Sequence, residues 1–302
     1  MRYILLNFNI SLQICLTKKN YGSIVFFYGQ GLFLPMLTGK VWRKKIYWLL
    51  PSSMHEMYKF NPDPFSKLLF YYYQSSLDIV DHIILFSPRL ISEWNLEKFR
   101  NKILVCPFHN VNVDMFTITT PYPDRPCIIG YIGRLSAEKG LQNFVKALPS
   151  ILSDQPGMQV YIFGEGPLKE SSMDWVQARG IQDHVKFPGW VSHDELPDYL
   201  NKLQLLVIPS YTEGGPTIMV EAMACGTPVL ATQVGVVQDF IRDGETGFIM
   251  KNNSPECIAE NVIRALSSPN LDKIAENARL FLDKNLTLEN SIQAWKRILD
   301  GT

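Results

Sequence analysis

The chain has 302 residues, of which 46% are hydrophobic and 19% charged, so it can bury a core and does not have the composition of a disordered protein. That length suits one large domain or two of ordinary size. The formal net charge is zero, yet residues 1–118 carry 13 Lys or Arg against 7 Asp or Glu, while residues 119–302 carry 16 against 22. No acidic residue precedes Glu56. This asymmetry suggests an anionic surface or substrate facing the N-terminal half.

Cysteine and histidine usage argues against metal and redox chemistry. The five cysteines form no C-x-x-C pair and the five histidines show no metal-ligand spacing, so we expect no metal and a reducing, cytosolic setting. The apolar stretch Tyr3–Leu16 is interrupted by polar residues and has its lysines after it, unlike a secretion signal. Ser23–Leu37 is too short and too broken to span a bilayer. We expect a cytoplasmic protein, peripheral at most to the inner face of the membrane, with no nucleic-acid partner.

In the first third of the chain, strand-like runs flank one helical segment, Ser66–Ile79. Thr117–Pro126, with three prolines and no apolar periodicity, is typical of a linker. The predicted strands are Ser23–Tyr28, Lys45–Leu50, His82–Phe86 and Lys102–Cys106.

A second set of alternating elements follows the linker. Its strands are nearly continuous apolar runs, as in a parallel sheet covered on both faces, so an α/β fold is predicted for each half. The predicted strands are Ile128–Gly133, Gln159–Gly164, His184–Phe187, Leu205–Pro209 and Pro228–Thr232. The predicted helices are Leu141–Ser153, Leu168–Arg179, Leu196–Asn201, Thr217–Cys225, Ser254–Ser267, Leu271–Lys284 and Leu288–Leu299.

Four motifs follow predicted strands of the second half, where open α/β sheets bind ligands. In the first, a strand ends at Gly133 and a loop then carries Arg134 and Lys139. Two cations at such an edge can hold a diphosphate, because a guanidinium pairs with two oxygens at once and an ammonium adds a mobile charge. The alternative is a pair of solvated surface charges.

The second and third motifs are weaker signals. Gly164 and Gly166 lie in a G-x-G-P sequence whose missing side chains would let backbone approach a ligand, although a tight turn is an equal alternative. A strand is then expected to close and turn at Pro188-Gly189, which leaves the backbone of Val191 free to meet a nucleobase edge. The alternative there is that Trp190 simply packs.

The fourth motif, Ser210 to Val229, is the strongest. Gly214-Gly215 gives an open loop, and Pro216 suits a first helical turn. The amides of Thr217 and Ile218 are then free donors at a helix N-terminus, which favours phosphate.

Two glutamates frame this fourth motif. Glu213 precedes the predicted helix and Glu221 lies about one turn inside it, among almost wholly apolar residues. An ionised carboxylate there needs polar partners. Vicinal ribose hydroxyls would supply them, and backbone groups are the alternative; the ligand is the favoured reading.

Together these motifs resemble glycosyltransferase family 4. The resemblance rests on G-R-L with E-K-G beyond it (Gly133–Gly140), then G-E-G-P, then E-G-G-P-T-I-M-V-E-A-M-A-C-G-T-P-V with its E-x7-E spacing. It runs from about His82 to the C-terminus. It implies the GT-B fold of two Rossmann-like domains, and a retaining hexosyltransferase that uses a nucleotide-diphosphate sugar without a metal or other cofactor. The acceptor would be a glycan or a lipid-linked molecule, as in polysaccharide biosynthesis.

The resemblance also implies residue roles. Arg134 and Lys139 would hold the diphosphate and stabilise the leaving group, Glu213 would contact the donor sugar, and Glu221 would bind the ribose. The remaining backbone contacts to the nucleotide would come from Gly133, Gly164, Val191, Gly214, Gly215, Thr217 and Ile218.

Three segments follow from the same comparison. Residues 1–118 would be a shortened acceptor-side domain that lacks the first strands and the glycine-rich loop, residues 119–286 the donor-binding domain, and residues 287–302 a helix crossing back to the N-terminal domain. His55 is a weak candidate for a sugar-contacting group, and a surface role is its alternative. The basic, aromatic segment Lys40–Trp48 either meets anionic lipid or is a solvated loop leading into a strand.

Two other functions stay open. The short front half could leave a donor-binding module that does not catalyse, either a gene fragment or a subunit completed by a partner. A different GT-B enzyme, such as an epimerase or a phosphorylase, is the third candidate, and the E-x7-E spacing argues against it.

Overall fold

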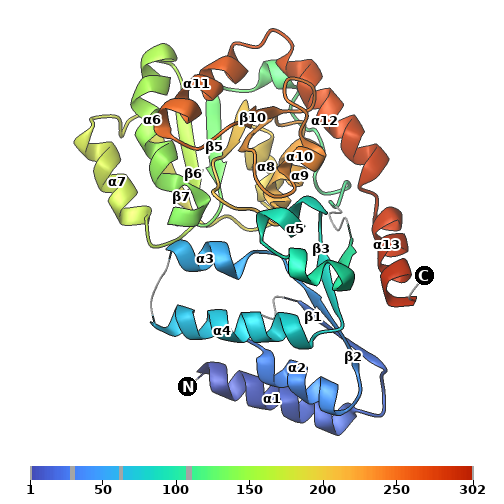
Figure 1. Ribbon diagram of the computed structural model, residues 1–302. Helices are drawn as coiled ribbons and strands as arrows, with labels where there is room; N and C mark the ends of the chain where they lie inside the picture. The colour runs from blue at the N-terminus through green and yellow to red at the C-terminus, as the bar shows by residue number, and fades with distance from the viewer. Residues whose placement is uncertain (1, 28–30, 61–63, 107–110, 301–302) are drawn as a thin grey trace. The chain divides into compact units, whose positions relative to one another are not determined.

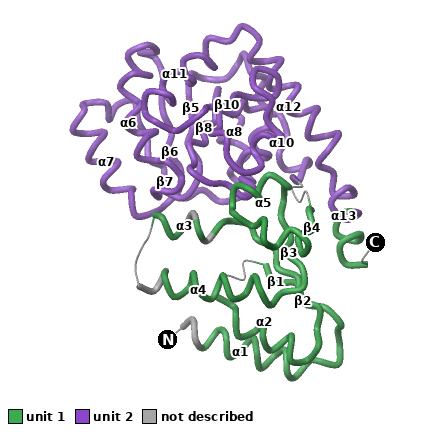
Figure 2. The backbone as a smooth tube through the Cα atoms, viewed as in Figure 1, with its two compact units in different colours: residues 1–108, 294–302 green, residues 109–293 purple. Residues whose placement is uncertain are grey.

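The computed structural model describes residues 2–27, 31–60, 64–106 and 111–300. The chain divides into two compact units, residues 1–108 with 294–302 and residues 109–293 (Figure 2). Each unit contains its own parallel sheet with helices around it (Figure 1). The expected α/β fold with two parallel sheets is thereby confirmed. The functional boundaries at 118/119 and 286/287 stay predictions.

The first unit is built on a four-stranded sheet in the order β1-β2-β3-β4. Its centre is β2, whose side chains from Ile46 to Leu49 are fully buried, including Tyr47 and Trp48. The strands are β1 (Ser23–Phe27), β2 (Lys45–Leu49), β3 (His82–Leu85) and β4 (Ile103–Val105). The helices are α1 (Arg2–Thr17), α2 (Phe33–Val41), α3 (Met54–Phe60), α4 (Pro64–Ile79) and α5 (Arg89–Glu93).

One carboxylate joins three of these elements. Asp81, just before β3, accepts hydrogen bonds from the backbone N–H of Ile46 at 2.8 Å and from Nζ of Lys40, at the end of α2, at 2.7 Å. These contacts hold the start of β2 in register. In residues 40–48, Ile46, Tyr47 and Trp48 are buried in β2, whereas Val41 and Trp42 are 69% and 39% exposed. Contact of this segment with anionic lipid stays a prediction.

The second unit contains a six-stranded parallel sheet in the order β10-β9-β8-β5-β6-β7. Its first strand along the chain lies in the interior, so chain order reverses between β5 and β8. Such a switch point opens a crevice at the carboxyl ends of the two strands, where α/β sheets bind ligands. The strands are β5 (Ile128–Ile132), β6 (Gln159–Phe163), β7 (Val185–Gly189), β8 (Leu205–Ile208), β9 (Val229–Thr232) and β10 (Phe248–Met250).

Helices cover both faces of this sheet (Figure 1). On one face α6 packs against α7 and α11, and on the other α9 packs against α8 and α12. This two-sided cover explains why β5, β8 and β9 are continuous buried apolar runs. The helices are α6 (Leu141–Asp154), α7 (Lys169–Ala178), α8 (Leu196–Leu200), α9 (Thr217–Ala224), α10 (Val237–Phe240), α11 (Pro255–Leu266) and α12 (Leu271–Asn285). The last helix, α13 (Leu288–Asp300), begins in this unit, and its residues from Ala294 onward belong to the first unit.

The observed bounds agree with the predicted ones within two residues, except for Tyr28, which lies outside the described residues. The turn expected at Pro188-Gly189 is wrong in one respect, because β7 continues through both residues. β7 is an edge strand, so the missing N–H of Pro188 leaves no ladder partner unsatisfied. The helices α1, α2, α3, α5 and α10 and the short strand β10 were not predicted.

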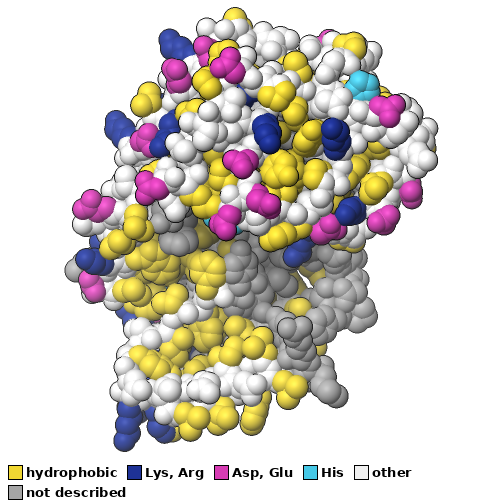
Figure 3. All heavy atoms as spheres, turned by 180° about the vertical axis from the view of Figure 1, so that it is seen from behind, with side chains coloured by type: hydrophobic (Ala, Val, Ile, Leu, Met, Phe, Trp, Pro, Cys, Tyr) yellow, Lys and Arg dark blue, Asp and Glu magenta, His cyan; other side chains and the backbone are white. Residues whose placement is uncertain are grey.

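The charge asymmetry of the sequence is visible on the surface. In Figure 3 most acidic side chains lie over the second unit, whereas hydrophobic side chains and some basic ones lie over the first. On α1, a stripe of apolar side chains at helical spacing is exposed, comprising Leu5, Phe8, Leu12 and Leu16.

Candidate functional site

Two loops meet at the switch point of the second unit, residues 133–140 after β5 and residues 209–216 after β8. Gly140 has a φ of +71°, and a Cβ at this position would lie 1.9 Å from the carbonyl oxygen of Pro209. The backbone N–H of Tyr211 donates to the carbonyl of Glu138 at 2.9 Å. Only glycine permits this approach, which brings the two loops into direct contact.

The contact between the loops places Lys139 beside Glu213. Nζ of Lys139 donates to Oε1 of Glu213 at 2.7 Å, and Oγ of Ser210 donates to the same oxygen at 2.6 Å. The side chain of Glu213 is 7% exposed and that of Lys139 is 33% exposed. The carboxylate is thus buried and satisfied, while the cation still reaches solvent, where an anionic ligand could approach it.

Arg134 lies on the same loop with an exposed side chain that has no hydrogen-bond partner among the described residues. Its backbone carbonyl accepts a hydrogen bond from the hydroxyl of Tyr131 at 2.9 Å. Burial raises the pKa of Tyr131, and the nearby carboxylates of Glu213 and Glu138 raise it further, so this phenol stays neutral and serves as a donor. The hydroxyl of Tyr131 therefore holds the backbone of this loop, while the side chain of Arg134 is exposed and that of Lys139 is partly exposed.

The predicted glycine positions after β5 and β6 also lie together. A Cβ on Gly164, whose φ is +123°, would lie 1.9 Å from the carbonyl oxygen of Gly133, and one on Gly166 would lie 2.4 Å from that of Leu135. These two glycines are needed for loop packing, whether or not a ligand approaches them. Gly133 itself has open space where a Cβ would be.

The segment 212–218 leads from Glu213 into α9. Gly214 is buried and Gly215 half-buried, and Pro216 precedes the first helical residue, Thr217. The amides of Thr217 and Ile218 donate to no group among the residues that the structure describes. The hydroxyl of Thr212 is buried and likewise has no partner there. A helix N-terminus and an unpaired buried hydroxyl therefore flank Glu213.

Glu221, one turn into α9, has a side chain that is 13% exposed. Its partner is His193, whose Nε2 lies 3.0 Å from Oε1 of Glu221. Burial raises the pKa of Glu221, and the hydrogen bond and charge of His193 oppose that rise. Sequence reasoning missed His193, because a histidine in the S-H-D-E loop carries no motif of its own. Val191, two residues earlier, is half-buried beside the exposed Trp190.

A second residue that the sequence did not reveal is Gly235. Its φ is +58°, and a Cβ there would lie 1.6 Å from the carbonyl oxygen of Glu213. The loop after β9 thus packs directly against the backbone of Glu213. The weaker candidate His55 lies in α3 of the first unit, with its ring 6.1 Å from that of Phe70.

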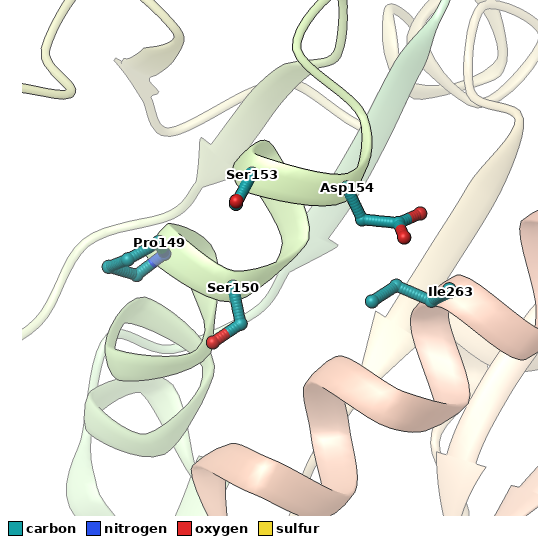
Figure 4. Close-up of a pocket in the computed structure, with 5 residues that line it drawn as sticks. All are labelled: Pro149, Ser150, Ser153, Asp154 and Ile263. Atoms are coloured by element: carbon teal, nitrogen blue, oxygen red, sulfur yellow. The ribbon is translucent and has the colours of Figure 1, made fainter.

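Figure 4 shows a pocket of about 540 Å³ elsewhere in the second unit, between α6 and α11. It is lined by Pro149, Ser150, Ser153, Asp154 and Ile263. The four lining residues of α6 lie in its C-terminal half, and Ile263 lies in α11. Lys139 precedes the N-terminus of α6, and a 14-residue helix is about 20 Å long. The pocket is therefore separate from the site described above.

Among residues 2–27, 31–60, 64–106 and 111–300, no group of three or more His, Cys, Asp or Glu side chains could hold a metal ion. No helix in that part of the chain combines the length and apolarity needed to cross a membrane.

Comparison with known proteins supplies independent information. A model of the family "Glycosyl transferases group 1" matches residues 119–281. The alpha-D-kanosaminyltransferase of Streptomyces kanamyceticus is 33% identical over 156 residues, which are 51% of this chain and 40% of that protein. The 2-deoxystreptamine N-acetyl-D-glucosaminyltransferase of Niallia circulans is 23% identical over 279 residues, 87% of this chain and 71% of that one. The match with the kanosaminyltransferase thus spans less than half of that protein's length.

Among solved structures, HepE of Anabaena in complex with UDP and glucose superposes with a TM-score of 0.81 at 17% identity. The superposition covers 97% of this chain and 81% of that chain. The likeness extends over both units and shows that this chain has the same fold.

Proposed function

Because the chain belongs to the group 1 glycosyl transferases and has their GT-B fold, we propose that it is a family 4 enzyme that transfers a hexosyl unit with retention. The donor is a nucleoside-diphosphate sugar, and the acceptor is a glycan or a lipid-linked molecule. One observation carries the proposal: the ion pair of Lys139 with Glu213 lies at the switch point of the sheet, and Glu221 follows eight residues later on α9.

In this proposal the donor diphosphate binds between the exposed cations and the start of α9. Arg134 and Lys139 supply positive charge, and the unpaired amides of Thr217 and Ile218 supply hydrogen bonds at a helix N-terminus. Charge grows on the diphosphate as the glycosidic bond breaks, and fixed donors stabilise that charge. These groups do the work that a metal ion does in other sites, and no metal or cofactor is part of the proposal.

The two carboxylates divide the rest of the donor between them. Glu213 contacts hydroxyls of the sugar, and its fixed position follows from its bonds to Lys139 and Ser210. Glu221 accepts the ribose hydroxyls, and Gly133, Gly164 and Val191 offer backbone beside the base and phosphates. UDP and glucose in HepE support a nucleotide sugar as the donor here.

For the acceptor we propose a molecule of polysaccharide biosynthesis, used in the cytoplasm at an anionic membrane surface. The exposed apolar stripe of α1 and the absence of acidic residues before Glu56 support this contact. Co-sedimentation with vesicles of anionic phospholipid, compared with neutral phosphatidylcholine vesicles, tests it. Equal recovery on both vesicle types, or none on either, contradicts an anionic-membrane contact.

The donor site is tested by calorimetric titration of the 302-residue chain with UDP, GDP and ADP, beside Glu221→Ala. We expect saturable binding of one of these nucleotides, weakened at least about tenfold in the variant by loss of hydrogen bonds to a charged group. Binding that is unchanged in Glu221→Ala overturns the assignment of Glu221. Once the donor is known, the anomeric proton coupling of the product in NMR decides between retention and inversion.

The alternative, a donor-binding module that does not catalyse, predicts a different result. It keeps nucleotide binding but releases no sugar from any nucleoside-diphosphate hexose, with or without added acceptor. Slow hydrolysis of the bound donor, abolished by Lys139→Ala, would exclude that alternative. The shortening of the N-terminal domain stays a prediction.

A further inference from the structure

Glu221 is a buried carboxylate on a helix that offers it few polar neighbours. It lies between Val220 and Ala222, which are 1% and 0% exposed. Among the residues that the structure describes, His193 is the one side chain that hydrogen bonds to its carboxylate. A buried carboxylate without compensation favours its protonated form. The histidine is therefore the main group opposing protonation of Glu221.

His193 is held in place from two sides. It follows β7, the edge strand of the sheet, and its Nε2 lies 3.0 Å from Oε1 of Glu221. The ring of Phe116 packs against the imidazole edge to face, with centroids 5.1 Å apart and planes at 62°. The side chain of His193 is 62% exposed, so one part of the imidazole faces solvent while its Nε2 contacts Glu221. The contacts with Glu221 and Phe116 hold the imidazole in position, so its hydrogen bond to the Glu221 carboxylate is maintained even though the ring is partly in solvent.

The contact leaves acceptor capacity on the carboxylate. An ionised carboxylate has two oxygens with about four lone-pair sites, and His193 uses one site on Oε1. Oε2 and the second site on Oε1 remain for two neighbouring hydroxyls. A protonated Glu221 would instead present a donor and would lose part of that capacity.

We propose that His193 is a positioning residue of the nucleotide site, which holds the Glu221 carboxylate ionised and oriented toward the ribose hydroxyls. The inference rests on the proposed donor site, since Glu221 is the group that it serves. The other titratable neighbours of Glu221 do not replace His193. Burial raises the pKa of the Cys225 thiol to about 12, so it is neutral, and Arg279 of α12 donates to the carbonyls of Phe116 and Ala224.

The first test is nucleotide binding as a function of pH. The nucleotide that binds wild type is titrated calorimetrically from about pH 5 to pH 8.5 into His193→Ala and His193→Gln. Without the imidazole, Glu221 protonates at higher pH, so the acid limb of the affinity profile moves upward. We expect about tenfold weaker binding than wild type near pH 6 and a difference of about twofold near pH 8. His193→Gln keeps a neutral hydrogen-bond donor, so its nucleotide affinity near pH 6 should lie between those of wild type and His193→Ala.

The control is His184→Gln, because His184 is at the opposite end of β7 and contacts the carbonyl of Met158. Its affinity profile should coincide with that of wild type. Circular dichroism melting checks that each variant is folded. A His193→Ala profile that coincides with wild type overturns the proposal, and so does an equal loss at every pH, which would indicate a packing role.

A second measurement separates this proposal from the function of the site. The carboxyl carbon of Glu221, assigned by comparison with Glu221→Gln, is followed by NMR pH titration in the nucleotide-free protein. Its midpoint should be higher in His193→Ala than in wild type, and an unchanged midpoint overturns the proposal. If no nucleotide binds wild type at any pH, the proposed donor site fails, while this titration still decides what His193 does to Glu221.

Discussion

Lys139 and Glu213, which are 74 positions apart in the chain, form an ion pair of 2.7 Å across the two loops that meet at the switch point of the second sheet. The pair is asymmetric, because the carboxylate is buried and hydrogen bonded to Ser210 whereas the ammonium is a third exposed. Such an arrangement fixes the direction of the lysine side chain and leaves two of its three N–H donors for a ligand. It is the most specific electrostatic feature of the candidate site.

Replacing Lys139 with Ala should weaken nucleoside-diphosphate binding by about ten- to a hundredfold, because a charge-assisted hydrogen bond is lost. Isothermal titration calorimetry measures the change. The matched control is Lys146→Ala on the exposed side of α6, which should bind like wild type. An equal dissociation constant for Lys139→Ala and wild type would remove this residue from the diphosphate site.

Glu221→Gln should stabilise the protein at neutral pH while damaging nucleotide binding. Burial raises the pKa of Glu221 in the folded state, so its contribution to stability is fully present below the unfolded-state pKa and is lost as pH rises through the folded-state value. Above that range the wild type holds a buried charge that the amide lacks. We expect the melting temperature of the variant to exceed that of wild type by about 1 to 3 °C at pH 7.5.

The same comparison at low pH provides the check. Near pH 3, which lies well below the ordinary glutamate pKa of about 4.3, Glu221 is protonated in both folded and unfolded chains, so the difference in melting temperature should vanish. A constant difference at all pH values would point to packing of the amide and not to titration of the carboxyl.

Gly235→Ala should disturb the site through the backbone of Glu213. The new Cβ would lie 1.6 Å from the Glu213 carbonyl oxygen, in addition to the strain of a positive φ. The positive φ alone costs about 1–2 kcal/mol for a non-glycine residue, and the displacement of Glu213 adds to it. Urea unfolding measures the loss, and nucleotide affinity should fall with it.

Gly244→Ala is the control for that substitution. Its φ is +75°, but a Cβ there meets nothing within 4 Å. Gly244→Ala should lower the unfolding free energy only by the strain of a positive φ, and it should leave nucleotide affinity unchanged. If Gly235→Ala and Gly244→Ala lower the unfolding free energy and the nucleotide affinity equally, the close approach of Gly235 to the Glu213 carbonyl has no effect on the site.

Arg125→Met should destabilise the second unit strongly. The guanidinium is 4% exposed and donates to the carbonyls of Leu203 and Cys225 at 2.9 and 2.7 Å and to Thr227 Oγ1 at 2.9 Å. Burial lowers the pKa of Arg125 to about 10, which leaves it charged at neutral pH. Removing it leaves several buried acceptors unpaired, at about 1–3 kcal/mol each when no water enters.

Urea denaturation of Arg125→Met beside Arg242→Met makes this quantitative. Arg242 is exposed, and its ion pair with Glu245 is 3.8 Å long, so its loss should change the unfolding free energy by less than about 0.5 kcal/mol. Similar stabilities for the two variants would show that other groups or water replace the buried guanidinium.

Most of the fold follows from local sequence patterns. Runs such as Ile128–Ile132 and Leu205–Ile208 are apolar throughout because helices cover both faces of their sheet, and that pattern is readable without a structure. The elements that were not predicted lack such a pattern. β10 is three residues long, and α1 has polar side chains among its apolar ones and buries little beyond Ile14 among its described side chains.

The sequence also shows the spacing of Glu213 and Glu221, because both lie in one continuous motif at the start of α9. It does not show Gly235 or Arg125 as important, since a lone glycine or arginine in a loop has no local signature. Their roles depend on which backbone they approach after folding.

By itself, then, the sequence determined the alternation of strands and helices, the glycines of the motifs after β5, β6 and β8, and which charged residues follow each of these strands. Tertiary structure alone decided which of those residues meet. Placing β8 beside β5 brings Lys139 to Glu213, and the course of the chain after β7 brings His193 to Glu221. The physical reason is that strand order is set by the packing of the whole sheet and its helices, which no short stretch of sequence encodes.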